Sequence, residues 1–113
     1  MYTPAAFRID DPDWIFAFVE ANDFGLLVSA APLTATHLPI HLIRPEGGRP
    51  ARLICHVARA NPHWRAFEGA GAEAIAMFRG PHAYVSSAWY GAHPAVPTWN
   101  YDAVQARGHA TLI

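Results

Sequence analysis

Two histidines near the middle of the chain, His37 and His41, have the i, i+4 spacing with which a helix can bind zinc. Pro39 lies between them and argues against a helix interior. On a strand, the two imidazoles would share a face but lie about 13 Å apart at roughly 3.3 Å per residue, which is too far to ligate one ion. The zinc interpretation is therefore weak. Two surface or half-buried strand residues are favoured, although the same spacing would let both histidines line one groove.

The thiol and hydroxyl side chains give no positive sign of nucleophilic catalysis. Cys55 precedes His56, but adjacent strand residues point to opposite faces, so the imidazole is poorly placed to activate the thiol. We expect a buried structural cysteine. Ser86 and Ser87 have no GxSxG elbow around them, and the chain contains neither a Walker loop nor a GxGxxG fingerprint. Hydrolase, kinase and Rossmann-dehydrogenase functions therefore have no support.

The stretch formed by residues 56–62 has the features of an anion site. It runs from a predicted strand end into a helix start, where free backbone N–H groups and the positive end of the helix dipole can hold a phosphate. Arg59 adds a fixed positive charge, and charge-assisted hydrogen bonds are stronger than neutral ones. An ordinary capped helix with a surface arginine is the alternative, and this segment alone does not decide between them.

Two aromatic segments, residues 84–90 and 96–101, suit a planar ligand. Each combines tryptophan and tyrosine with hydroxyl or amide groups, and prolines mark the second segment. Such segments offer flat apolar walls with a few polar tips, which is the usual composition of a pocket for a ring system. Core packing is the alternative for each aromatic residue taken singly. Two clusters in irregular segments favour binding modestly.

The elements that would position these residues begin with one helix. Asp10 and Asp11 precede Pro12, which is a typical helix start, and capping preferences explain this aspartate cluster without a catalytic role. Asn22 and Gly25 are stop signals. The predicted helix has about three turns, with an apolar face made of Trp14, Ile15, Phe18 and Val19.

After that helix the hydrophobic period changes to that of strands. We predict strands at residues 24–30, 35–43 and 52–57 as antiparallel neighbours, followed by a short helix from Pro62 to Phe67. A strand at 74–78 comes next, Gly80 and Pro81 break or bend it, and extended segments follow at 82–86 and from Pro97 to Ile113. This pattern is mainly β with small helices. It favours a β-barrel over a doubly wound α/β sheet, built as a single unit from residues 1–113.

Composition limits the partners. The chain has 8 basic and 9 acidic residues, a net charge of −1 and no basic tail, so strong nonspecific nucleic-acid binding by this segment alone is not expected. One cysteine cannot form an internal disulfide, and neither a signal segment nor a membrane-spanning stretch is apparent. We expect a cytoplasmic protein without membrane association.

Five motifs in order give a resemblance to a known family. They are MYTPAAF (residues 1–7), THLP (36–39), HVARANP (56–62), GPHAYVS (80–86) and VPTWNY (96–101). Together they resemble the PaiB family, which is labelled FMN-binding negative transcriptional regulator. The resemblance implies an FMN-binding split β-barrel related to pyridoxamine-phosphate oxidases, a homodimer, and FMN lying across the subunit interface. Relatives are typically longer, so it also implies a chain truncated at its C-terminus.

The resemblance also assigns three groups of cofactor-binding residues. The isoalloxazine ring would be flanked by Thr36, His37, Leu38 and Pro39. The phosphate would be surrounded by His56, Ala58, Arg59 and Asn61. The residues that would complete the pocket are Ser86, Ser87, Trp89, Tyr90, Trp99 and Asn100. They could belong to the partner subunit. The loop at residues 91–95 is shorter than the family pattern, which weakens the case for contacts from that loop.

The resemblance favours a transcriptional repressor. The chain shows no helix-turn-helix pattern or basic recognition helix, so contact with DNA would come from the dimer surface, the missing region or a partner. The alternative is a flavin-dependent oxidoreductase, in which His37 or His41 near the ring could relay protons. A barrel that no longer binds flavin and acts only as an interaction module is a third hypothesis.

Overall fold

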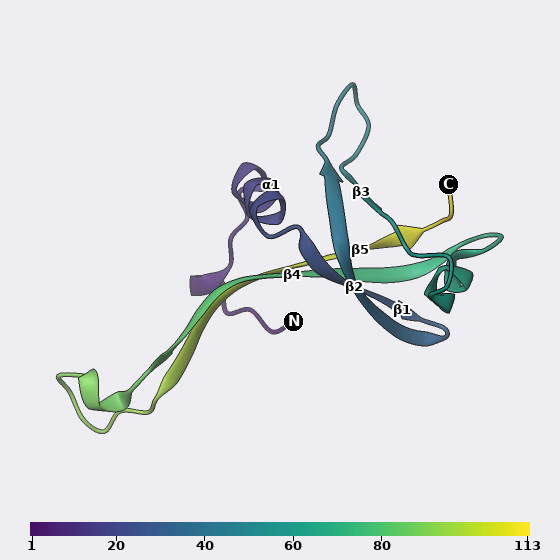
Figure 1. Cartoon of the computed structure of the whole chain (residues 1–113). Helices are drawn as coiled ribbons and strands as arrows, with labels where there is room; N and C mark the ends of the chain where they lie inside the picture. The colour runs from purple at the N-terminus through teal and green to yellow at the C-terminus, as the bar shows by residue number, and fades with distance from the viewer.

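Five strands form one antiparallel sheet in the computed structural model, which describes residues 1–113. Their order across the sheet is β3-β2-β1-β4-β5, and the colours of Figure 1 follow them along the chain. The elements in chain order are η1 (Ala5–Phe7), α1 (Pro12–Ala21), β1 (Phe24–Ala30), β2 (Leu33–Ile43), β3 (Arg52–Cys55), η2 (Pro62–Phe67), β4 (Ala72–Val85), η3 (Ser87–Trp89) and β5 (Thr98–Ala110).

The mainly β fold agrees with the prediction, and the first three strands are antiparallel neighbours as expected. The sheet is curved but does not close, so β3 and β5 remain edge strands within this chain. β2 begins at Leu33, two residues earlier than predicted, and β3 ends at Cys55, two residues earlier than predicted. The last extended segment ends at Ala110 rather than Ile113.

β2 shows how the sequence selects the faces of the sheet. Leu38, Ile40 and Leu42 are buried, whereas the alternate positions His37 and Pro39 are exposed. Successive side chains of a strand point to opposite faces, so this alternation directs one set of apolar residues into the core. The nine buried apolar residues come from α1, η2 and the three strands β1, β2 and β4, and they form one cluster. The sheet face that carries Leu38 is thus the inner face.

The turn between β2 and β3 is set by two glycines. Gly47 and Gly48 both have positive φ, at 57° and 78°, and the Arg49 N–H donates to the carbonyl of Glu46 at 3.0 Å. Positive φ at both central residues defines the tight hairpin turn whose twist matches that of the flanking strands. The tight turn therefore spans residues 46–49.

Of the two alternatives predicted at Gly80 and Pro81, a break or a bend, the bend is confirmed, because β4 continues through both residues to Val85. The strand contains an irregularity between Arg79 and His82, where its register against β5 shifts. Such a bulge bends a strand without ending it. A Cβ at Gly80 would lie 2.7 Å from Cε2 of Phe18, so only glycine lets α1 approach β4 this closely.

Beyond this bulge, β4 and β5 leave the body of the sheet as a two-stranded arm (Figure 1, lower left). Residues 82–85 pair with residues 98–101, and η3 lies in the connection between them. We call residues 82–101 the aromatic arm. Its projection makes the molecule elongated, with extents of 57 × 34 × 20 Å and a radius of gyration of 17.4 Å. A compact domain of this length would have a radius of gyration of about 13 Å.

The predicted helix is α1, and its start and end follow the sequence signals. The Asp11 side chain accepts from the backbone N–H of Asp13, Pro12 occupies the first turn, and Asn22 caps the end. Phe18 and Val19 are buried as predicted, while the other two members of the predicted apolar face are only partly covered. None of the helices has the length and apolar character that crossing a bilayer requires.

Candidate functional site

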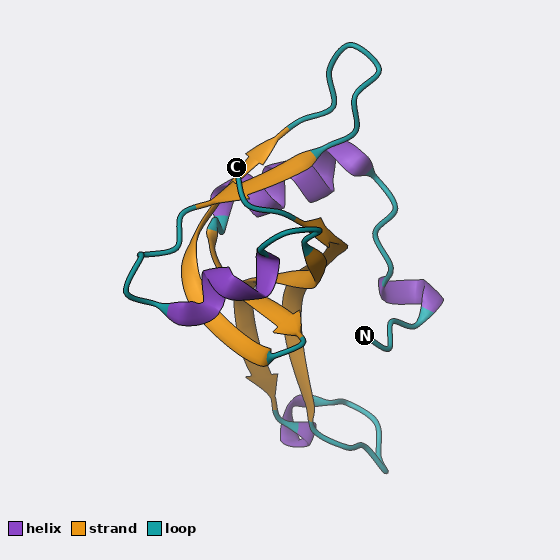
Figure 2. Cartoon of the chain, turned by 90° about the vertical axis from the view of Figure 1, so that its right-hand side faces the viewer, coloured by secondary structure: helices purple, strands orange, loops and turns teal.

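The short helix predicted after β3 forms as η2, a six-residue 3₁₀ helix that packs on β2 within the curve of the sheet (Figure 2). Asn61 caps it, because its Oδ1 accepts from the backbone N–H of His63 at 3.0 Å. Pro62 fits the first helical position because it has no N–H to satisfy. His63 and Phe67 turn into the core, with ring centroids 5.4 Å apart.

His63 is the centre of a buried polar network. This histidine is only 1% exposed. Its Nε2 lies 3.1 Å from Oγ of Ser29, which is fully buried in β1. Its Nδ1 lies 2.9 Å from Oγ1 of Thr36 in β2. Thr36 also accepts from Nδ2 of Asn61 at 3.2 Å. The network therefore joins η2 to β1 and β2.

The hydrogen bonds fix the direction of every proton in this network. Ser29 Oγ donates to the carbonyl of Pro32 at 2.6 Å, so its hydrogen is used and it must accept from Nε2–H of His63. His63 is then the neutral Nε2–H tautomer, and its Nδ1 accepts the hydroxyl hydrogen of Thr36. Burial acts in the same direction, because it disfavours the imidazolium and lowers the pKa of His63.

Two arginines lie against one indole at the surface of η2. The guanidinium of Arg59 lies 4.9 Å from the centroid of Trp64, and that of Arg65 lies 5.5 Å from it. Trp64 Nε1 also donates to the carbonyl of Arg59 at 3.0 Å, which ties the loop to the helix. Neither guanidinium is paired with a carboxylate. Two guanidiniums without a carboxylate partner thus lie on Trp64, three residues after Asn61.

The predicted anion site had two parts, a helix start and the guanidinium of Arg59, and only the guanidinium part fits a phosphate here. The predicted use of a helix dipole does not hold, because η2 is a single short 3₁₀ helix and the N–H of His63 is already bonded to Asn61. Two guanidiniums held on Trp64 keep N–H donors at their edges, and Asn61 retains one amide hydrogen without an acceptor. Guanidinium donors match the geometry of a phosphate group.

The other residues predicted near the phosphate and the ring lie on different surfaces. His56 and Ala58 are exposed in the segment that leads to η2. His37 lies on the outer face of β2, where it stacks on Phe24 with centroids 6.3 Å apart, and Pro39 is exposed on the same face. Leu38 is 4% exposed, so its side chain belongs to the core. Among the residues of β2 predicted to flank the ring, only Thr36 bonds to a residue predicted to surround the phosphate, which is Asn61.

The aromatic arm carries all six residues predicted to complete the pocket. Trp99 stacks on His82 at 5.6 Å and donates from Nε1 to its Nδ1 at 3.2 Å, and Tyr84 packs beside it at 5.9 Å. The arm nevertheless leaves its aromatic surface open, since Trp99 is 54% exposed and Trp89 is 73% exposed. The remaining predicted residues of the arm are Ser86, Ser87, Tyr90 and Asn100.

The structure does not bring the arm residues together with those around η2. Figures 1 and 2 both show the arm extending away from the body, and η2 lies on the body beside β2. A single copy of the chain therefore has two separate halves of the predicted site. One half offers guanidinium and amide donors, and the other offers flat aromatic surface.

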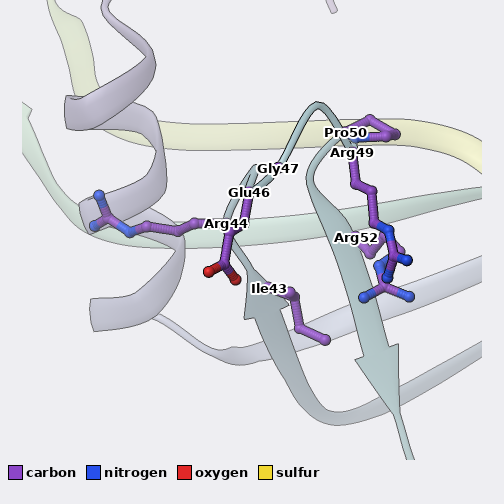
Figure 3. Close-up of a pocket in the computed structure, with 7 residues that line it drawn as sticks. All are labelled: Ile43, Arg44, Glu46, Gly47, Arg49, Pro50 and Arg52. Carbon is purple, nitrogen blue, oxygen red and sulfur yellow. The ribbon is translucent and has the colours of Figure 1, made fainter.

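Two further surfaces do not take part in either half. The expected buried cysteine is wrong, because Cys55 is exposed at the end of an edge strand. Neighbouring atoms still desolvate the thiol enough to raise its pKa, which opposes a nucleophilic role. A cavity of about 330 Å³ at the β2–β3 turn is lined by Ile43, Arg44, Glu46, Gly47, Arg49, Pro50 and Arg52 (Figure 3), and it contains none of the predicted site residues.

Sequence reasoning missed His63, Ser29 and Arg65. The capping pattern of Asn61 and Pro62 locates the start of η2, but the pattern does not reveal which side of so short a helix faces the core. Ser29 sits in an apolar strand, and its pairing with His63 connects residues far apart in the sequence. The position of Arg65, six residues after Arg59, was the one available signal for a second phosphate contact.

Comparison with known proteins places these features in a family. A family model described as "Putative FMN-binding domain" matches residues 1–113. "Protease synthase and sporulation protein PAI 2" of Bacillus subtilis is 40% identical over 116 residues, covering 100% of this chain and 54% of that protein. An uncharacterized protein of Saccharomyces cerevisiae is 30% identical over 95 residues, covering 80% of this chain and 51% of its own length.

An uncharacterized protein of Aspergillus fumigatus is 32% identical over 130 residues, covering 84% of this chain and 50% of its own length. The chain thus spans about half the length of the curated relatives that it matches. The family match covers every residue of the chain, and the Bacillus relative aligns along all of it. The chain belongs to the PaiB-like family of FMN-binding proteins, and its cofactor is FMN.

Proposed function

We propose that two copies of this chain bind FMN between them, with the phosphate at η2 of one copy and the ring against the aromatic arm of the other. The observation that carries this proposal is the separation of the two half-sites within one chain (Figure 1). The aromatic arm has exposed tryptophan and tyrosine surface that a flavin ring can stack on. The two guanidiniums on Trp64 suit the other end of the same molecule.

The exposed area of the chain supports a partner. The surface accessible to solvent is 8289 Å², whereas a compact monomer of this mass would expose about 6,100 Å². The excess is well above the roughly 800 Å² that each partner buries in a standard interface, and it is in the range of large obligate dimers. Much of the exposed apolar surface belongs to the arm, including Tyr84, Trp99 and Tyr101. A second copy that covers the arm would remove this surface from water.

The residues have distinct tasks in the proposed site. FMN supplies the electron chemistry when it is bound. Arg59 and Arg65 donate to the phosphate oxygens, and Asn61 offers its free amide hydrogen. Trp99 stacks on the flavin ring and helps to exclude water.

We propose transcriptional regulation as the physiological role, because the Bacillus relative is named for protease synthesis and sporulation. The chain has net charge −1, so its contact with DNA would depend on local arginines and not on overall charge. A gel-shift titration at several salt concentrations tests direct repression. Specific binding of an operator fragment at physiological ionic strength supports it, and absence of such binding by the FMN-loaded protein contradicts it.

The same preparation tests the flavin site and separates regulator from enzyme. FMN titration with absorption and fluorescence, combined with sedimentation, should give two FMN per dimer. A monomer that binds FMN at full stoichiometry would contradict the shared site. Bleaching of the bound flavin by a nicotinamide donor would instead favour a flavin-dependent oxidoreductase.

A further inference from the structure

The network around His63 reaches the proposed flavin site through two residues, Thr36 and Asn61. We propose that His63 is a positioning residue for the flavin phosphate. It holds the Thr36 hydroxyl and the Asn61 amide so that Asn61 presents a hydrogen-bond donor, and no acceptor, to the ligand. This proposal rests on the proposed function, because it requires the phosphate to bind beside Asn61.

The bonds of Asn61 define what remains for a ligand. Its Oδ1 accepts from the backbone N–H of His63 at 3.0 Å, and one Nδ2 hydrogen goes to Thr36 at 3.2 Å. The amide therefore has one free hydrogen on Nδ2. A phosphate dianion has only acceptors, so it can use this hydrogen, and it would be repelled by a carbonyl oxygen in the same place.

The backbone N–H of His63 orients the amide by donating to Oδ1, and His63 Nδ1 reinforces this orientation through Thr36. Nδ1 accepts the hydroxyl hydrogen of Thr36, which leaves the lone pairs of Oγ1 free to accept from Asn61. Without that acceptor, the hydroxyl hydrogen can turn toward Asn61 and stabilise the flipped amide. The flipped amide would put Oδ1 beside Thr36, where the donor stood before, and it would lose the bond from the backbone N–H of His63. His63 Nδ1 therefore acts together with that N–H and not alone.

His63 acts through its neighbours and not by direct contact with the ligand. It is 1% exposed, and its ring packs on Phe67 inside the core. Its Nε2–H is held by Ser29, which is fully buried and whose own hydrogen is given to Pro32. This anchorage determines the tautomer, and the tautomer makes Nδ1 an acceptor.

The test compares FMN with riboflavin, which lacks the phosphate. Binding is measured near pH 8, because the second phosphate pKa of about 6 would otherwise add its own pH dependence. His63→Phe keeps an aromatic ring in the core but removes both ring nitrogens. We expect FMN affinity to fall about tenfold or more, the effect of losing charge-assisted hydrogen bonds, while riboflavin affinity changes little.

Phe67→Leu is the matched control, because it disturbs the same small helix and leaves the hydrogen bonds in place. It should lower thermal stability but keep the preference for FMN over riboflavin. Equal losses for both flavins in His63→Phe, or no loss, would overturn the positioning role. Failure of the wild type to bind FMN would overturn the proposed function. This outcome is distinct from failure of the positioning role, in which the wild type binds FMN and only the variant results differ from expectation.

A second measurement needs no variant that might alter folding. Nitrogen-15 spectra of the ligand-free wild type report which imidazole nitrogen of His63 carries the proton. We expect a protonated Nε2 and an unprotonated Nδ1. A proton on Nδ1 would overturn the proposal, because Thr36 could then no longer donate to His63.

Discussion

Thr36 and His63 are joined by a hydrogen bond of 2.9 Å between Oγ1 and Nδ1, across 27 residues of sequence. Thr36 belongs to β2 and His63 to η2, so this bond attaches the short helix to the sheet. On its other side, Thr36 contacts Asn61, which belongs to the proposed phosphate site. The core and the proposed phosphate site therefore meet at one hydroxyl group.

Arg59→Ala should weaken FMN binding more than tenfold. Loss of a charge-assisted pair with phosphate typically costs at least about 1.5 kcal/mol, which corresponds to that factor. Arg49→Ala is the matched control, because this arginine lies at the β2–β3 turn, outside the proposed site. Isothermal titration with FMN measures both variants. Unchanged affinity in Arg59→Ala would show that the phosphate binds elsewhere.

Trp99→Ala should weaken both FMN binding and dimer formation while leaving the fold of each chain intact. Trp99 is 54% exposed, so its stacking on His82 and Tyr84 contributes only about 1 kcal/mol to the stability of one chain. Leu33→Ala serves as the control, because Leu33 is an apolar side chain that is 83% exposed and lies at the first residue of β2, outside the arm. Sedimentation at several protein concentrations measures the dimer. Equal behaviour of the two variants would contradict a role for the arm.

The free energy of unfolding should decrease as the pH falls below about 6.5, the ordinary pKa of histidine. Burial lowers the pKa of His63 in the folded chain, so the unfolded chain takes up its proton first. The contribution of neutral His63 is therefore complete above the unfolded pKa and is lost as the pH falls toward the folded pKa. One proton limits the slope to about 1.4 kcal/mol per pH unit.

His63→Phe provides the control for this pH dependence, because the variant lacks the titrating group. His109 acts in the opposite direction: its hydrogen bonds to Ala70 and then to Glu73 raise its pKa, so its contribution is lost as the pH rises. That contribution is common to both proteins and cancels. Urea unfolding of both proteins at a series of pH values measures the difference. Parallel profiles would rule out a buried neutral imidazole.

Gly71→Ala should destabilise the chain more than Gly69→Ala. Both glycines have positive φ, at 79° and 65°, so alanine costs about 1 kcal/mol in backbone strain at either position. At Gly71 a Cβ would also meet Nε2 of His109 at 2.8 Å, whereas at Gly69 it would meet no atom within 4 Å. Thermal unfolding of the two variants isolates the steric part. Equal midpoints would contradict the crowding at the end of β5.

The sequence predicted most elements because their signals are local. Capping by Asp11 and the apolar spacing that buries Phe18 define α1, and alternation defines β2. The sequence left open whether the strand breaks or bends at Gly80, because tertiary contact decides that position. Phe18 of α1 packs against Gly80, and the β5 ladder carries the strand past Pro81 with a bulge.

The site was predictable in its residue types but not in its connections. Arg59 and Asn61 could be named from the sequence, and their fit to phosphate rests on charge and donors. The indole of Trp64 that holds Arg59 and the histidine that bonds Thr36 depend on how η2 turns toward the sheet. No periodic pattern describes a six-residue helix well enough to show this.

The aromatic arm has a genetic consequence in the proposed dimer. Each pocket would take η2 from one copy and the arm from the other. Within one copy, a substitution in η2 and a substitution in the arm would therefore affect different pockets of the dimer. A cell that makes both an Arg59→Ala and a Trp99→Ala chain would assemble mixed pairs with one intact pocket. Two defective alleles would then complement each other in part.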